Sequence, residues 1–156
     1  MKGIFSILVE NKDGALSGIA GLFARRGFNI DSLAVGRTEN DDISSMTIVS
    51  SGDQRTIEQI EKQLNKKVDI IKVRRLSEPK SVSLEMMLAK VSFTLANRSS
   101  LVELCQITGA KIVKVSPKYF LIEYHDDPEG VEDFIVMLKS YGIMELQRTG
   151  TISMEK

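Results

Sequence analysis

The chain has 156 residues, 42% of them hydrophobic and 27% charged, which suffices for a packed core and argues against disorder. Lys plus Arg and Asp plus Glu number 21 each, so the formal charge is zero, which argues against nucleic-acid binding. The single cysteine excludes an internal disulfide and fits a reducing compartment. With no apolar run of about 20 residues and no signal peptide before the first strand, we expect a soluble, cytoplasmic protein.

The first half of the chain predicts the element order βαββαβ, a compact sheet with helices on one face. The first strand is largely apolar on both faces, so we expect its second face to be covered too, for which a partner subunit is the candidate. A bulge near Asp31 and Ser32 is expected in the second strand, because its apolar alternation slips there. The predicted elements are strands at 2–10, 30–38, 43–51 and 68–76, a first helix ending at Arg26, and a second helix at 54–65 capped by Asp53.

The segment from residue 9 to residue 30 carries the predicted binding site. A polar turn follows the first strand, Asp13 is the predicted N-cap of the first helix, and Gly27 ends that helix. Asn11 closes the first strand and Asn29 opens the next, so we expect both amides at one end of the sheet. Between them lie the unpaired N–H groups of a helix start, which suit a small zwitterion.

The second half repeats the pattern after a linker, residues 77–81, in which Pro79 discourages a continuous element. Its predicted elements are a strand at 82–93, a short helix opened by a capping box of Ser100 and Glu103, a hairpin at 111–124, a helix starting at Asp127 and Pro128, and a last strand at 143–154. The sequence therefore predicts an α+β protein of two ferredoxin-like βαββαβ modules, residues 1–77 and 78–156.

Nothing in the sequence assembles a catalytic or metal site. The one histidine, His125, is expected in a solvated loop, and Cys105 lies on the apolar stripe of a helix, where an inert core thiol is expected. A Cys–His pair of nucleophile and base is therefore the less favoured interpretation. No glycine-rich phosphate loop is present.

Two other classes of protein share this topology. RNA-binding modules stack bases on aromatic residues exposed on central strands, whereas Phe5 looks like a core residue and the third strand has no aromatic. An acylphosphatase-like enzyme needs an arginine in the first strand–helix turn, where this chain has Asp13. Both classes are disfavoured, and a screen with oligonucleotides, acyl phosphates and amino acids would separate the three.

The stretch from Leu22 to Ile30 is the most specific sequence signal in the chain. Further signals lie at residues 11–16, 31–33, 56–64 with Val73, 110–113, 141–143 and 148–150. On these stretches, which span nearly the whole chain, the sequence closely resembles the regulatory small subunit of acetolactate synthase, and its first half resembles an ACT domain, an amino-acid-sensing module.

The resemblance implies a non-catalytic subunit that activates a large subunit carrying thiamin diphosphate, Mg²⁺ and FAD, at the entry to branched-chain amino acid (valine and isoleucine) biosynthesis. It also implies feedback inhibition by a branched-chain amino acid, usually valine, and a homodimer with the effector at an interface between two ACT domains. The implied effector-binding residues are Asn11, Asp13, Gly14, Ala15, Leu16, Asn29 and Ile30. No metal site and no membrane or nucleic-acid partner is implied.

The residue types agree with this assignment. Asparagine offers donors and acceptors for an ammonium and a carboxylate, Gly14 allows close approach of the backbone, and Leu16 or Ile30 can contact a branched side chain. Ordinary turn chemistry would also explain Asn11 and Asp13. The alternative function is an ACT-type sensor of another amino acid that serves a different enzyme or regulator.

Overall fold

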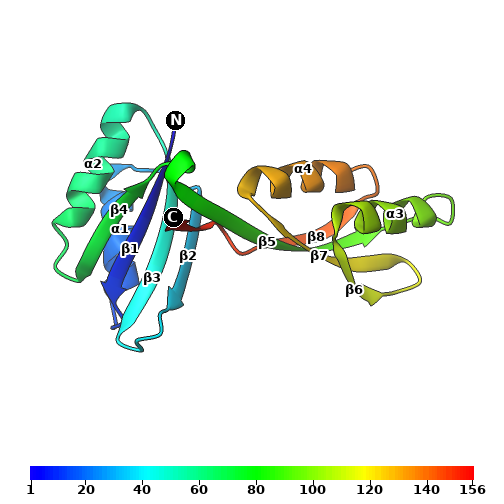
Figure 1. The fold of residues 1–156 in the computed structure, drawn as a ribbon, viewed down its shortest axis with the longest axis horizontal. Helices are drawn as coiled ribbons and strands as arrows, with labels where there is room; N and C mark the ends of the chain where they lie inside the picture. Colours follow the sequence, from blue (N-terminus) through cyan, green and yellow to red (C-terminus); the bar gives the residue numbers. More distant parts are fainter. The chain divides into compact units, whose positions relative to one another are not determined.

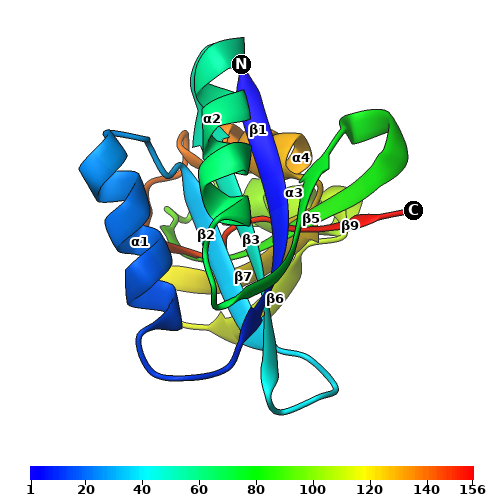
Figure 2. The ribbon, with the colours of Figure 1, turned by 90° about the vertical axis from the view of Figure 1, so that its left-hand side faces the viewer.

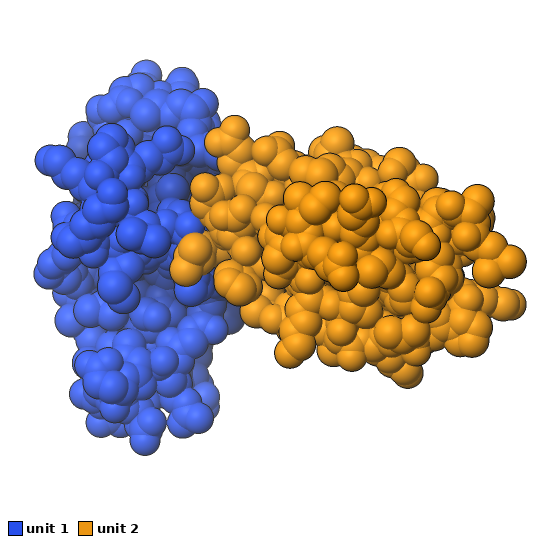
Figure 3. Space-filling model, turned by 45° about the vertical axis from the view of Figure 1, so that its right-hand side comes forward, with its two compact units in different colours: residues 1–83, 150–156 blue, residues 84–149 orange.

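The computed structural model describes residues 1–156, which form two compact units (Figure 3). The first unit comprises residues 1–83 and 150–156, and the second comprises residues 84–149. The predicted boundary between residues 77 and 78 differs from this division in two ways. The chain enters the second unit six residues later, and its last seven residues return to the first unit, because they form a strand that binds there.

The first unit is a four-stranded antiparallel sheet in the order β2-β3-β1-β4, with α1 and α2 on one face (Figures 1 and 2). Strand β1 is central, and its residues Lys2 to Glu10 pair with Ser51 back to Ile43 of β3. The elements are β1 (Lys2–Glu10), α1 (Ala15–Arg26), β2 (Ser32–Arg37), β3 (Ile43–Ser51), α2 (Gln54–Asn65), β4 (Ile70–Leu76) and the 3₁₀ turn η1 (Glu78–Lys80).

The core of the first unit lies between the sheet and its two helices. Alternation along β1 directs Phe5, Ile7 and Val9 into this core, where Phe23 of α1 and Ile60 of α2 are also buried. The other face of β1 is half-buried, as expected from its apolar residues. The chain's own strand β9 (Ile152–Glu155) lies against β1, β3 and β4 and covers part of that face.

Local sequence signals explain the ends of the helices in the first unit. Asp53 caps α2, since its carboxylate accepts a hydrogen bond from the Thr56 N–H at 2.7 Å, and this prediction is confirmed. Gly27 ends α1 with φ of 68°, also as predicted. The predicted bulge near Asp31 and Ser32 is absent: β2 begins only at Ser32 and keeps an unbroken register with β3.

The second unit repeats the arrangement with the sheet order β6-β7-β5-β8 and with α3 and α4 on one face (Figure 1). The predicted α+β fold of two βαββαβ modules is therefore confirmed. Its elements are β5 (Ser81–Ser92, which starts in the first unit), α3 (Arg98–Thr108), β6 (Lys111–Val115), β7 (Tyr119–Asp126), α4 (Pro128–Leu138) and β8 (Ile143–Arg148).

Two details of the second half differ from the prediction. Helix α3 begins after Asn97 rather than at Ser100, because the chain turns at Thr94, whose N–H donates to Asn97 Oδ1 at 2.7 Å. The predicted last strand is two strands, β8 and β9, separated at Gly150, which has φ of 81°. The predicted start of α4 is confirmed, with Asp127 as the cap and Pro128 in the first turn. No helix is long and apolar enough to cross a bilayer.

Candidate functional site

The turn after β1 fixes Asn11 firmly. Its backbone N–H donates to Asp42 O and its side-chain Nδ2 donates to Asp41 O, both at 2.8 Å. The turn between β2 and β3 therefore holds the asparagine side chain in one orientation. Because Nδ2 is used, Oδ1 is the atom through which Asn11 would accept a hydrogen bond from a ligand ammonium.

The start of α1 differs from the prediction, because Asp13 is not its cap. The N-cap is Gly14, at φ of 84°, and no side chain accepts a hydrogen bond there. A side chain at Gly14 would be strained in this left-handed conformation. The Ala15 N–H donates to Lys12 O at 3.4 Å, so without a capping carboxylate the next two amides, those of Leu16 and Ser17, are the ones available to an anionic group such as a ligand carboxylate.

Charges around this turn are largely paired. Lys12 Nζ lies 2.8 Å from Asp69 Oδ1 and 2.9 Å from Glu10 Oε2. The hydrogen bond to Asp69, then that to Glu10, raises the pKa of Lys12 above its usual range. The lysine is therefore occupied by these two acids, and the backbone amides of α1 are the main electropositive groups at the turn.

The aliphatic candidates differ in how accessible they are. Leu16 is 45% exposed beside the helix start, so its side chain is available to a ligand. Ala15 is buried in the core and offers only its backbone. Ile30 is partly buried against the core of the first unit.

Asn29 lies in a compact polar network at the start of β2. Its Nδ2 donates to the Asp31 carboxylate, which also accepts a hydrogen bond from Ser51 Oγ, while Ser50 Oγ donates to Asn29 O. The Asp31 N–H donates to Val49 O at 2.8 Å. The predicted site did not include Asp31, Ser50 or Ser51. Asp31 lies in the matching stretch 31–33, and the serine pair at the end of β3 was the only sequence signal for Ser50 and Ser51.

The structure does not bring Asn11 and Asn29 together within one chain, so the prediction that both lie at one end of the sheet is wrong. Asn11 follows the Glu10–Ile43 end of the ladder, whereas Asn29 lies at Ser50, seven residues along β3. At about 3.4 Å per residue this is roughly 24 Å. The physical reason is that α1 runs back along the sheet, so β2 starts at the opposite end from the end of β1.

Cys105 and His125 do not lie together as a nucleophile and a base. Cys105 is buried on α3, and burial raises the pKa of its thiol, which makes it a poor nucleophile. His125 lies in β7 rather than in a loop, and it is exposed while the preceding core residue Ile122 is buried. Alternation from Ile122 directs His125 away from the helices, hence away from Cys105. No group of three or more His, Cys, Asp or Glu side chains could hold a metal.

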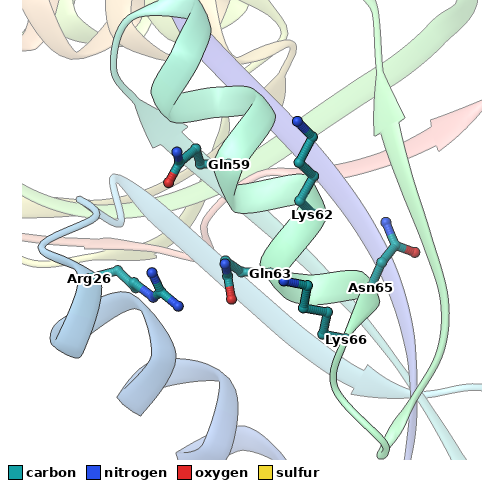
Figure 4. Close-up of a pocket in the computed structure, with 6 residues that line it drawn as sticks. All are labelled: Arg26, Gln59, Lys62, Gln63, Asn65 and Lys66. Carbon is teal, nitrogen blue, oxygen red and sulfur yellow. The ribbon is translucent and has the colours of Figure 1, made fainter.

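A shallow cleft of about 530 Å³ lies elsewhere in the first unit, where the end of α1 meets α2 (Figure 4). Its lining is rich in cations and amides: Arg26, Gln59, Lys62, Gln63, Asn65 and Lys66. Cations in the last turn of a helix complement the negative end of its dipole, which accounts for Arg26 and Lys62. The cleft contains none of the predicted effector-binding residues.

Comparison with known proteins identifies the family to which both units belong. The family model "AHAS small subunit-like ACT domain" matches residues 5–72, and the model "Small subunit of acetolactate synthase" matches residues 84–156. These two matches lie mainly in the first and the second unit, respectively.

Individual relatives match over almost their full length. The chain is 49% identical over 154 residues to the probable acetolactate synthase small subunit of Archaeoglobus fulgidus, covering 99% of this chain and 96% of that protein. It is 42% identical to the acetolactate synthase small subunit of Haemophilus influenzae, covering 100% of this chain and 96% of that protein. The crystal structure of the small subunit from Thermotoga maritima superposes with a TM-score of 0.92 at 39% identity, covering 100% and 98%. This chain therefore belongs to the family of acetolactate synthase small subunits.

Proposed function

We propose that this chain is the regulatory subunit of acetolactate synthase, which activates a large catalytic subunit and makes it sensitive to a branched-chain amino acid, with valine as the effector. The observation that carries the proposal is the match of both units, over nearly the whole chain, to acetolactate synthase small subunits. The thiamin diphosphate, Mg²⁺ and FAD of the reaction belong to the large subunit. This chain's own role is to bind the effector and the large subunit and to transmit the effect of the first on the second.

The chemistry of the first unit suits an amino acid effector. The uncapped start of α1 offers amides to the carboxylate, and Asn11 Oδ1 offers an acceptor to the ammonium. Leu16 supplies an exposed aliphatic surface next to them, which suits a branched side chain. Asn29 and Asp31 form a second polar group that suits the same ligand, but at the far end of the sheet.

A homodimer would unite the two halves of this site. Strand β2 is an edge of the sheet, and two copies can pair their β2 strands antiparallel about a two-fold axis. With the axis at Val35, near the middle of β2, Asn29 of one copy would lie opposite Asp41 of the other. The carbonyl of Asp41 accepts the hydrogen bond from Asn11 Nδ2, so each Asn29 would approach the Asn11 of the second copy.

The experiment that tests this function measures acetolactate formation by the large subunit, loaded with all its cofactors, with and without this chain. The chain alone should convert no pyruvate, its addition should raise the output, and valine should reverse part of the gain. Unchanged output on adding the chain would contradict the proposal and favour a sensor for another enzyme. A panel of leucine, isoleucine, serine and phenylalanine as alternative effectors tests the choice of valine.

A further inference from the structure

The last seven residues of the chain, Gly150–Lys156, form a C-terminal segment on the face of the first sheet opposite the helices (Figure 2). Two of its backbone amides donate to hydroxyls of the sheet: Thr151 N to Ser32 Oγ at 2.8 Å, and Ser153 N to Thr47 Oγ1 at 3.3 Å. Farther along, Glu155 forms an ion pair with Arg74 of β4. The segment is therefore bound to β2, β3 and β4 by these contacts, and it also lies against β1 and pairs with β5.

The closest approach is at the first residue of the segment. A Cβ on Gly150 would lie 3.0 Å from Leu33 O and 3.0 Å from Ser32 Oγ, and its φ of 81° also disfavours any other residue. Thr151, which follows, is only 5% exposed. The start of β2 and the start of the C-terminal segment are thus in direct contact.

This contact adjoins the polar network of Asn29. The network holds Asp31 through its carboxylate and through its N–H, and Ser32 is the next residue along the chain. A ligand that takes the amide of Asn29 must replace its hydrogen bond to Asp31, and a ligand ammonium would attract the Asp31 carboxylate. Either change acts on the backbone that carries Ser32.

The other end of the segment continues directly into the second unit. Only Thr149 separates Gly150 from Arg148, whose Nε lies 2.7 Å from Glu85 Oε1 and whose Nη1 lies 3.0 Å from Glu132 Oε2. Glu85 is 6% exposed, and its hydrogen bond is the main cause that raises the pKa of Arg148 above its ordinary value. The arginine therefore stays charged, and it anchors the end of β8 firmly within the second unit.

We propose that Ser32 and Gly150 are positioning residues that couple the effector site to the second unit. In this proposal, which rests on the proposed function, occupancy at Asn29 changes the Ser32–Thr151 hydrogen bond. The C-terminal segment transmits that change along the chain to Arg148. Neither residue binds the effector, so the proposal separates effector binding from its consequence. Coupling between sites requires such an element, whose arrangement both sites bias.

The test uses the full chain with the large subunit and valine as the probe. Ser32→Ala removes the acceptor of the Thr151 N–H, and Gly150→Ala forces Leu33 and the segment apart. Both variants should activate the large subunit within twofold of wild type and, without it, bind valine within threefold. Inhibition by saturating valine should be lost. Hydrogen exchange of residues 150–156 should respond to valine in wild type only.

Matched variants separate coupling from general damage. Ser32→Thr keeps the hydroxyl and should restore inhibition. Gly109→Ala introduces the same backbone strain, at φ of 77°, in a place with open space around it, and should leave inhibition unchanged.

If valine inhibits the complexes formed with wild type, Ser32→Ala and Gly150→Ala to the same extent, the coupling proposal is overturned. If valine does not inhibit the complex formed with wild type, the proposed function fails, and the coupling proposal that rests on it fails too. If Gly150→Ala does not fold, Ser32→Ala alone decides, since it removes a single oxygen.

Discussion

Asn11 and Asn29 differ in how firmly the protein holds their side chains. Asn11 is tied to the backbone of the β2–β3 turn through its Nδ2, so it is oriented before any ligand arrives. Asn29 donates to the carboxylate of Asp31 in an exposed network, so it must exchange that partner to bind a ligand. A pre-oriented group contributes to affinity without loss of side-chain freedom, whereas an exchanging group is suited to signalling occupancy.

Replacing Asn29 by Leu should weaken valine binding by about tenfold or more, since a lost hydrogen bond to a charged group is worth roughly 1.5–3 kcal/mol. Isothermal titration calorimetry on the folded variant measures this. Asn65→Leu is the control, because Asn65 is exposed on α2 and belongs to neither half of the proposed site. An Asn29→Leu variant that folds and binds valine as tightly as wild type would remove Asn29 from the site.

Strand β2 is the element on which the proposed dimer depends. It is an edge strand, and Val35 near its middle is 47% exposed although its ladder partner Met46 is buried. An edge with unpaired N–H and C=O groups and apolar side chains is a ready template for a second strand. The same edge carries Ser32 and lies next to Asn29, so the proposed dimer interface, the proposed effector site and the C-terminal segment meet on one strand.

Replacing Val35 by Glu should convert the dimer to a monomer at micromolar concentration, because two new carboxylates would face each other near the two-fold axis. Light scattering measures the mass. Valine affinity should fall as the dimer is lost, because each proposed site needs residues from both copies. Val113→Glu on β6 is the matched control, since Val113 is 48% exposed on an edge strand of the other sheet. A wild-type chain that is monomeric with and without valine would contradict the dimer.

For the molecule as a whole, the proposed regulation requires that valine bind the activating and the inhibiting arrangements with unequal affinity, since equal affinity shifts no equilibrium. The chain's two units are joined by only two chain crossings, at residues 83–84 and 149–150, and the second crossing begins the C-terminal segment.

Linkage then predicts that the large subunit weakens valine binding by the same factor by which valine weakens the activating association. That factor should lie at about 5–150-fold, which corresponds to a coupling of about 1–3 kcal/mol. Titrations of valine into the chain alone and into the reconstituted complex measure it directly. Equal affinities in the two titrations, in a complex that valine does inhibit, would show that inhibition arises without this coupling.

The sequence by itself determined the features that depend on neighbouring residues. The element order follows from apolar periodicity, and the caps at Asp53 and Asp127 and the stop at Gly27 follow from local backbone chemistry. The family follows from motifs such as residues 22–30, which are read in the same local way. One local prediction was wrong: Gly14 and not Asp13 is the N-cap of α1.

Only the tertiary structure decided where distant segments meet. The path of α1 back along the sheet puts Asn29 at the opposite end from Asn11, although both asparagines border the same helix in sequence. The return of residues 150–156 to the first unit rests on the pairing of β9 with β5, on the Glu155–Arg74 ion pair, and on hydrogen bonds from backbone amides to the hydroxyls of Ser32 and Thr47. Such acceptors look like any polar residue in a strand, and contacts between positions more than a hundred residues apart leave no periodic pattern in the sequence.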